Sequence, residues 1–131
     1  MTFFRQGTQV GSISVTGSAT AYNTSSDVSL KKNIVDAPSA SDKIDAIQVR
    51  SFDWKSTDEH QEYGFIAQEL RTVVPEAVTA PEDMTWSVDY SKLVPLLVKE
   101  VQELRARVAE LENHEQSTRA LAALVTELES K

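Results

Sequence analysis

The sequence predicts an α+β fold, in which a small mixed domain follows thin N-terminal β strands and precedes a long C-terminal helix. The stretch "GSISVTGSATAY" alternates small polar residues with Ile13, Val15, Ala19 and Ala21, the period of two that is typical of strands. Short helical and strand patterns alternate in the middle of the chain, and a heptad pattern fills the last third. We therefore divide the chain into strands over 1–25, an α+β body over 26–96 and a coiled-coil-like helix over 97–131.

Composition limits what the chain can do. Its 131 residues, 40% of them hydrophobic, allow one modest core. The net charge of −7 argues against nucleic acid, and the lack of cysteine excludes a disulfide, a thiolate nucleophile and a cysteine zinc site. The sequence has no membrane-spanning run and no signal-peptide pattern. We expect no nucleic acid, membrane, metal or cofactor, and we expect the chain to begin in the middle of a longer one.

The N-terminal strands are too thin to be stable alone. Their inward side chains are short, and three of the four glycines, Gly7, Gly11 and Gly17, fall among them. Such strands need partners, which often come from other chains.

The middle of the chain predicts short elements that share one core. "SASDKIDAI" indicates a short helix, "RSFDWKS" a strand, "YGFIAQELRTVV" a helix that stops at Pro75, and "MTWSVDY" a second strand. Trp54 and Trp86 lie on the two strands, and we expect them to pack in one core rather than to stack on a ligand.

The last third predicts an oligomerisation helix. Apolar residues recur at steps of four and three, at Leu97, Val101, Leu104, Val108 and Leu111. After a three-residue shift they resume at Leu121, Val125 and Leu128. Either one helix is locally overwound there, or Asn113 ends a first helix and Ser117 caps a second. The alternative to oligomerisation is a helix packed only on its own domain.

The junction "NTSSDVSLKKNI" is either a solvated turn or a catalytic site. A serine becomes nucleophilic when a base takes its proton, and a lysine can be that base where burial lowers its pKa. Ser26 and Lys31 are separated by about 140° on a helix and lie on opposite faces of a strand. A dyad therefore needs a turn between them or a lysine from a neighbouring subunit, and Lys32 is the alternative base.

Several motifs together resemble one family. "YNTSSDVSLKKNI", "FDWK", "YGFIAQEL", "VPEAV" and "VDYSKLVPLLVKEVQEL" look, in this order and spacing, like the C-terminal intramolecular chaperone domain of bacteriophage tail spikes and tail fibres, the peptidase S74 family. The resemblance implies a domain that trimerises, directs assembly of the β-rich fibre before it, and then cuts itself off through a serine–lysine dyad. It implies virion assembly in the host bacterial cytoplasm, with the fibre kept in the tail and the domain released.

The resemblance also assigns residues. The serine that opens the S-D-x-x-L-K motif is Ser26, its lysine is Lys31, and the scissile bond is Ser25–Ser26. Ser29 stands where the family often has an arginine. Asp27 and Asn33 either hold the turn or help to polarise the scissile carbonyl, and His60 is either a surface histidine or a supporting residue of the site.

Two indications of oligomeric state conflict. Leu at the d positions with Val at the a positions favours a two-stranded coil, whereas the resemblance implies a homotrimer. We expect a trimer, because thin Gly- and Ser-rich strands at the end of a fibre intertwine threefold and two heptads are weak evidence. The alternative function is a permanent trimerisation or host-adhesion tip without proteolysis.

Overall fold

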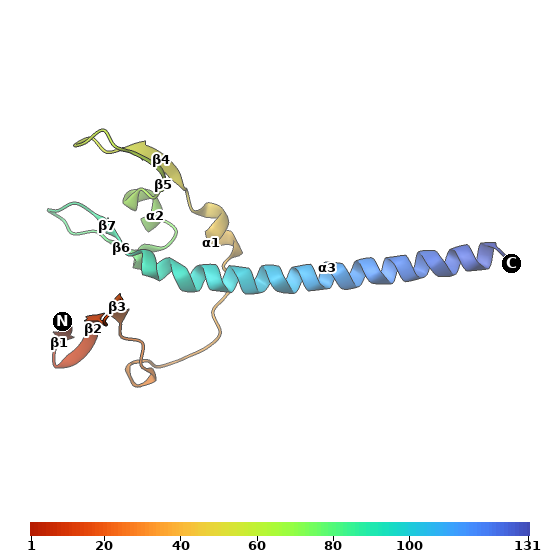
Figure 1. Ribbon diagram of the computed structural model, residues 1–131, viewed down its shortest axis with the longest axis horizontal. Coiled ribbons are helices and arrows are strands. Elements are labelled where there is room, and N and C mark those ends of the chain that lie inside the picture. Colours follow the sequence, from red (N-terminus) through yellow and green to blue (C-terminus); the bar gives the residue numbers. More distant parts are fainter. The chain divides into compact units, whose positions relative to one another are not determined.

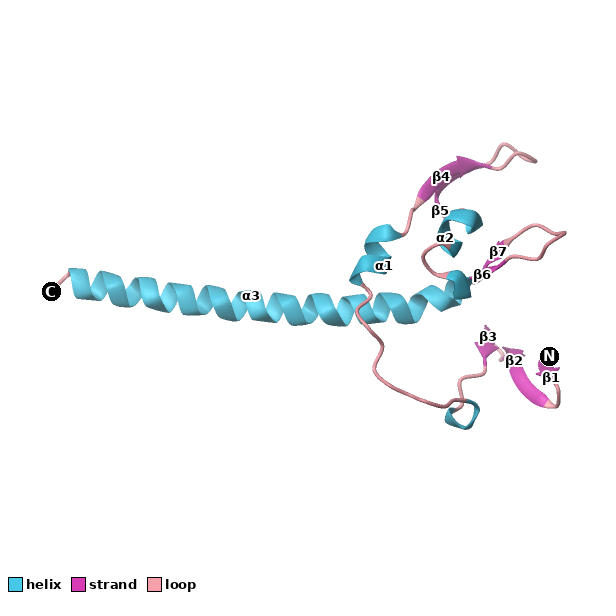
Figure 2. Cartoon of the chain, turned by 180° about the vertical axis from the view of Figure 1, so that it is seen from behind, coloured by secondary structure: helices cyan, strands magenta, loops and turns pink.

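A computed structural model describes all residues from 1 to 131 and divides the chain into two units, Met1–Asp36 and Ala37–Lys131. The first unit contains antiparallel strands, and the second combines short strands with helices (Figure 2). The predicted α+β fold, with N-terminal strands and a long C-terminal helix, is confirmed.

The first unit contains a three-stranded antiparallel sheet in the order β1 (Thr2–Arg5), β2 (Thr8–Val15) and β3 (Thr20–Thr24). Gln6 and Gly7 join β1 to β2 with positive φ angles of 49° and 80°, which suit a two-residue hairpin turn. Gly11 of β2 is the one buried residue of the sheet. The small side chains thus leave a thin and largely exposed sheet.

The second unit begins with short elements. In chain order they are α1 (Ser41–Ala46), β4 (Arg50–Asp53), β5 (His60–Gly64), α2 (Ala67–Arg71), the 3-10 helix η2 (Pro75–Ala77), β6 (Val78–Thr79), β7 (Ser87–Val88) and the 3-10 helix η3 (Tyr90–Lys92). Strand β4 pairs with β5, and β6 pairs with β7, both antiparallel. The helix α3 (Leu93–Glu129) follows.

A small apolar core holds this unit together. Leu70 of α2, Val74, Ala77 of η2 and Leu93 of α3 form its buried cluster, and Leu70 and Val74 are each only 2% exposed. Leu70 lies in α2, and Val74 follows the helix, where its backbone N–H donates to the carbonyl oxygen of Leu70 at 2.8 Å. The helix predicted before Pro75, together with the turn that follows it, therefore builds the centre of the core.

The prediction that the two tryptophans share one core is wrong. Trp54 is 52% exposed and packs edge-to-face against Phe52, with ring centroids 5.4 Å apart. Trp86 lies instead under the guanidinium of Arg71, 4.9 Å from its ring centroid. The physical reason is that β4–β5 and β6–β7 are separate two-stranded sheets, so no continuous sheet face brings the two rings together.

Helix α3 is one continuous helix of 37 residues, which decides between the one-helix and two-helix alternatives. Its start packs on the core through Leu93 and Leu96, and Pro95 falls in the first turn, where a missing N–H is tolerated. The hydroxyl of Ser41, at the start of α1, then donates to Glu100 and Glu103 of α3, and beyond this contact the helix runs out alone from the other elements of its unit (Figure 1). No helix of the structure combines the length and the apolar character needed to cross a bilayer.

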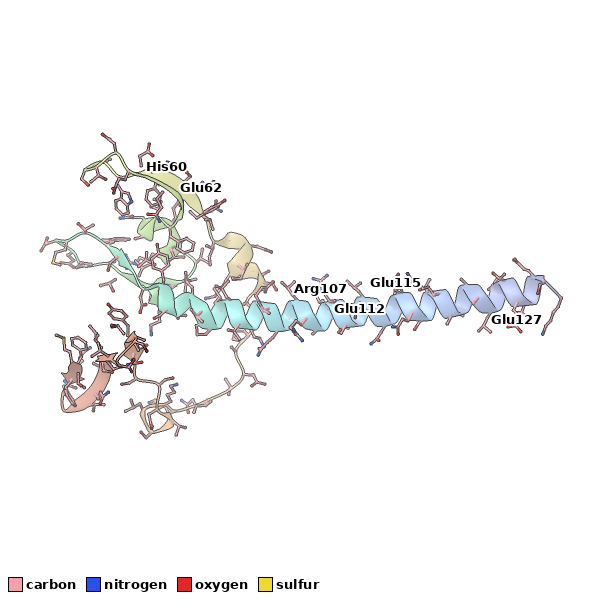
Figure 3. All side chains as sticks on the ribbon, in the orientation of Figure 1. His60, Glu62, Arg107, Glu112, Glu115 and Glu127 are labelled. Atoms are coloured by element: carbon pink, nitrogen blue, oxygen red, sulfur yellow. The ribbon has the colours of Figure 1, made fainter.

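The heptad residues of α3 lie uncovered. Leu97, Val101, Leu104, Val108 and Leu111 are between 51% and 64% exposed. Charged side chains project into solvent along the rest of the helix, among them Arg107, Glu112, Glu115 and Glu127 (Figure 3). The helix thus carries an apolar stripe for which the single chain provides no partner.

Candidate active site

A single helical turn brings the two ends of the motif together. The 3-10 helix η1 (Val28–Leu30) follows Asp27, whose carboxylate accepts the backbone N–H of Ser29 at 2.8 Å and also its hydroxyl. The backbone N–H of Lys31 donates to the carbonyl oxygen of Val28 and closes the turn. Aspartate favours this conformation because its short side chain can bond to the backbone two residues ahead.

The turn places Ser26 and Lys31 in direct contact. The Lys31 Nζ donates a hydrogen bond of 2.6 Å to the Ser26 Oγ. The contact forms within one chain, through the turn that the spacing of the two residues required. Lys32 makes no hydrogen bond with Ser26. Both Ser26 and Lys31 are exposed to solvent in the single chain.

Ser25, on the other side of the candidate scissile bond, is fixed to the sheet. Its backbone N–H donates to the carbonyl oxygen of Val10 at 3.1 Å, and its hydroxyl donates to the carbonyl oxygen of Gln9 at 2.7 Å. The bond between Ser25 and Ser26 therefore joins a residue held by β2 to the first residue of the turn. Sequence reasoning missed this anchor, since both acceptors are backbone carbonyls that any sequence would carry.

The electrostatics of the turn favour a charged Asp27. Hydrogen bonds from the Ser29 hydroxyl and then from its backbone N–H hold the pKa of Asp27 below its ordinary value, and the positive charge of Lys31 contributes less. The first role of this carboxylate in the single chain is thus to bind Ser29. Ser29 acts as a donor within the turn.

Asn33 lies just after the dyad in a left-handed conformation, with a φ of 54°. Asparagine tolerates this region better than most residues, so it suits the bend that follows Lys31. Its side chain makes no hydrogen bond to Ser26 or Lys31. Its position agrees with a role in the turn, and any role at the scissile carbonyl stays a prediction.

His60 belongs to the second unit, on β5 (Figure 3). Its Nδ1 lies 2.7 Å from Asp53 Oδ1, and its Nε2 lies 3.2 Å from Ser51 Oγ, both on the paired strand β4. These two contacts link a serine, a histidine and an aspartate as in a catalytic triad, but all three side chains are exposed. Without a water-excluding cleft such hydrogen bonds provide little catalysis, so we assign them a surface role. A supporting role for His60 at the dyad stays a prediction.

The structure contains no cluster of three or more His, Cys, Asp or Glu side chains that could hold a metal ion. The groups that the turn brings together at the junction are a hydroxyl, an amine and a carboxylate, from Ser26, Lys31 and Asp27. A hydroxyl in contact with an amine is the arrangement that serine–lysine hydrolysis uses.

Comparison with known proteins gives one family. Residues 26–79 match the peptidase S74 family, described as chaperone of endosialidase. The match begins at Ser26 and includes Lys31 and the elements from α1 to β6, while the sheet of the first unit and α3 lie outside it. No curated protein matches the chain. The match confirms, over residues 26–79, the resemblance to the peptidase S74 family that the sequence motifs indicated.

Proposed function

We propose that this chain is an intramolecular chaperone that trimerises, registers a phage tail fibre or tail spike, and then releases itself by one cleavage between Ser25 and Ser26. The observation that carries the proposal is the 2.6 Å hydrogen bond between Lys31 Nζ and Ser26 Oγ. The family match supports it independently, because the family is one of chaperones and its matched segment starts at Ser26.

The proposed chemistry needs only the chain and water. A neutral Lys31 amine takes the hydroxyl proton of Ser26, and the Oγ attacks the carbonyl carbon of Ser25. The lysine returns the proton to the departing nitrogen of Ser26, which leaves the Ser25 acyl group as an ester on Oγ. Water then hydrolyses this ester, so Ser25 ends in a carboxylate and Ser26 begins the released domain with a free amine.

The state of the lysine couples this reaction to assembly. In the single chain Lys31 is exposed and its Nζ donates to Ser26, whereas a base must offer the serine proton a lone pair. Neighbouring chains that cover the turn would exclude water and favour the neutral amine. Cleavage would then follow assembly rather than precede it.

The chaperone role follows from the thin sheet and the uncovered helix. Pairing between strands of different chains is slow and leaves open edges that aggregate. The apolar stripe of α3 would hold three chains together and raise the effective concentration of their strands. We place this assembly in the cytoplasm of the bacterial host, with the upstream fibre kept in the virion tail.

Intact mass spectrometry of freshly expressed protein tests the proposal, together with light scattering for the oligomeric state. We expect a trimer and two fragments that separate between Ser25 and Ser26. A trimer that stays uncut would contradict proteolysis and favour a permanent trimerisation or host-adhesion tip. A dimer or monomer would contradict the trimer.

A further inference from the structure

We infer that the pairing of β2 with β3 positions the scissile bond, so that Ser25 is a positioning residue and cleavage depends on the closed register of these two strands. The inference rests on the proposed self-cleavage. It adds a requirement on the residue before the scissile bond. The serine–lysine contact sets no such requirement, because Ser26 and Lys31 both follow that bond in the sequence.

The strand pairing continues up to the bond itself. The register of β2 and β3 runs from Val15 opposite Thr20 to Gly11 opposite Thr24. Ser25 extends it by one residue with the two hydrogen bonds to the carbonyl oxygens of Val10 and Gln9. Ser26 is the first residue without a partner on β2, and its hydroxyl binds Lys31 instead.

The two residues that react, Ser25 and Ser26, are thus held by separate hydrogen bonds. Ser25, which carries the carbonyl carbon, is held by β2 through its N–H and its hydroxyl, and the Oγ of Ser26 is held by Lys31 on the capped turn. Rotation about the Ser25 backbone swings the carbonyl relative to the nucleophile, and the N–H and hydroxyl bonds of Ser25 oppose this rotation. Alignment of reacting groups strongly affects the rate of intramolecular attack, so the anchor should influence the rate directly.

Gly11 makes the register sensitive to a single methyl group. A Cβ added at Gly11 would lie 2.7 Å from the carbonyl oxygen of Asn23, too close for the backbones of β2 and β3 to stay in place. Asn23 is two residues before Ser25, so displacement there would move the anchor. Gly17, in the turn that joins the same two strands, has nothing within 4 Å of an added Cβ, and its φ needs no glycine.

The experiment measures the first-order rate of self-cleavage by intact mass in five proteins. They are the wild-type chain, Ser25→Ala, Ser25→Thr, Gly11→Ala and Gly17→Ala. We expect Ser25→Ala to be about 5- to 10-fold slower, the effect of one lost hydrogen bond, and Ser25→Thr to recover near wild-type rate because it keeps the hydroxyl. We expect Gly11→Ala to be slower by about tenfold or more and Gly17→Ala to be unchanged.

A second readout separates positioning from proton transfer. The pH at which the rate is half-maximal should be the same in Ser25→Ala as in wild type, because the dyad is intact. Wild-type rates in both Ser25→Ala and Gly11→Ala would overturn the inference and leave the proposed function standing. Equal slowing by Ser25→Ala and Ser25→Thr would also overturn it. If Gly11→Ala does not fold by circular dichroism, the Ser25 pair decides, and an uncut wild-type chain would reject both the inference and the proposed function.

Discussion

Lys31 reaches Ser26 across one turn of 3-10 helix and donates a 2.6 Å hydrogen bond to its hydroxyl. The two residues are five apart, a spacing that neither a helix nor a strand brings to one face. The cap that Asp27 provides to the Ser29 N–H produces the required turn. The contact between Ser26 and Lys31 is therefore local, and each chain of an assembly would carry its own dyad.

Substitution of either dyad residue should abolish cleavage and spare assembly. Ser26→Ala removes the nucleophile, and Lys31→Ala removes the base. Lys31→Arg should fail as well, because a guanidinium stays protonated in proteins. Both side chains are exposed and lie on no apolar face, so light scattering should still give a trimer. Intact mass should show a single uncut chain for all three variants.

Lys32→Ala is the matched control for Lys31→Ala, because the two lysines are adjacent and both are exposed. It should cut at about the wild-type rate. If Lys31→Arg cuts itself at the wild-type rate and Lys32→Ala stays uncut, Lys31 is not the base and Lys32 is.

Self-cleavage should depend on protein concentration. If assembly covers Lys31 and favours its neutral amine, unfolded chain diluted to concentrations at which no trimer forms should stay uncut. The same chain at higher concentration should be cut, and the rate should fall at low pH, where the amine is charged. Time courses of intact mass across a dilution series measure this. A first-order rate that is identical in monomer and trimer would separate catalysis from assembly.

The carboxyl group of Asp27 should titrate below the ordinary value of 3.8. Because its pKa is lowered in the folded turn, the stabilisation that it provides is present above the unfolded value and is lost as the pH falls through the folded one. Ser29→Ala removes the largest cause, the hydroxyl donor, and should raise the pKa of Asp27 toward the ordinary value. Side-chain carboxyl shifts followed by NMR, in uncut Ser26→Ala protein, measure this. An unchanged titration in Ser29→Ala would contradict the proposed hydrogen bond.

The heptad stripe of α3 should be required for the trimer. Leu104→Asp places a charge on the stripe, where each buried leucine is expected to contribute about 1.5–3 kcal/mol, and should dissociate the assembly. Ala106→Asp introduces the same charge two residues later, off the stripe, and should leave the trimer intact. Truncation before Leu97 should also give monomers. Light scattering distinguishes these results, and a trimer that survives the truncation would assign assembly to the body or to the strands.

Much of the fold could be predicted from local patterns. The periods of the strands and of α3 are properties of contiguous sequence. The predicted helix before Pro75 is present but ends at Arg71, so it supplies Leu70 to the core, and Val74 joins the core from the turn that follows. The positions of Trp54 and Trp86 could not be predicted, because they depend on whether the two strand pairs join into one sheet. No local signal in either stretch specifies that they remain separate.

The candidate site was predictable in its residues but only partly in its geometry. The spacing of Ser26 and Lys31 required a turn, and aspartate at 27 is a residue type that forms one. The anchor on Ser25 was not predictable, since it depends on the register between β2 and β3 and uses backbone acceptors. The partners of His60, Ser51 and Asp53, depend in the same way on the pairing of β4 with β5.

The two hydrogen bonds of Ser25 have a further consequence for the product that stays behind. A cut after Ser25 would leave a polypeptide whose final residue is already tied to its neighbouring strand. Frayed ends are where exopeptidases begin to digest a chain and where unfolding starts. A product that ends in a hydrogen-bonded residue offers no frayed end to exopeptidases. Its final length would therefore be determined by the cut itself.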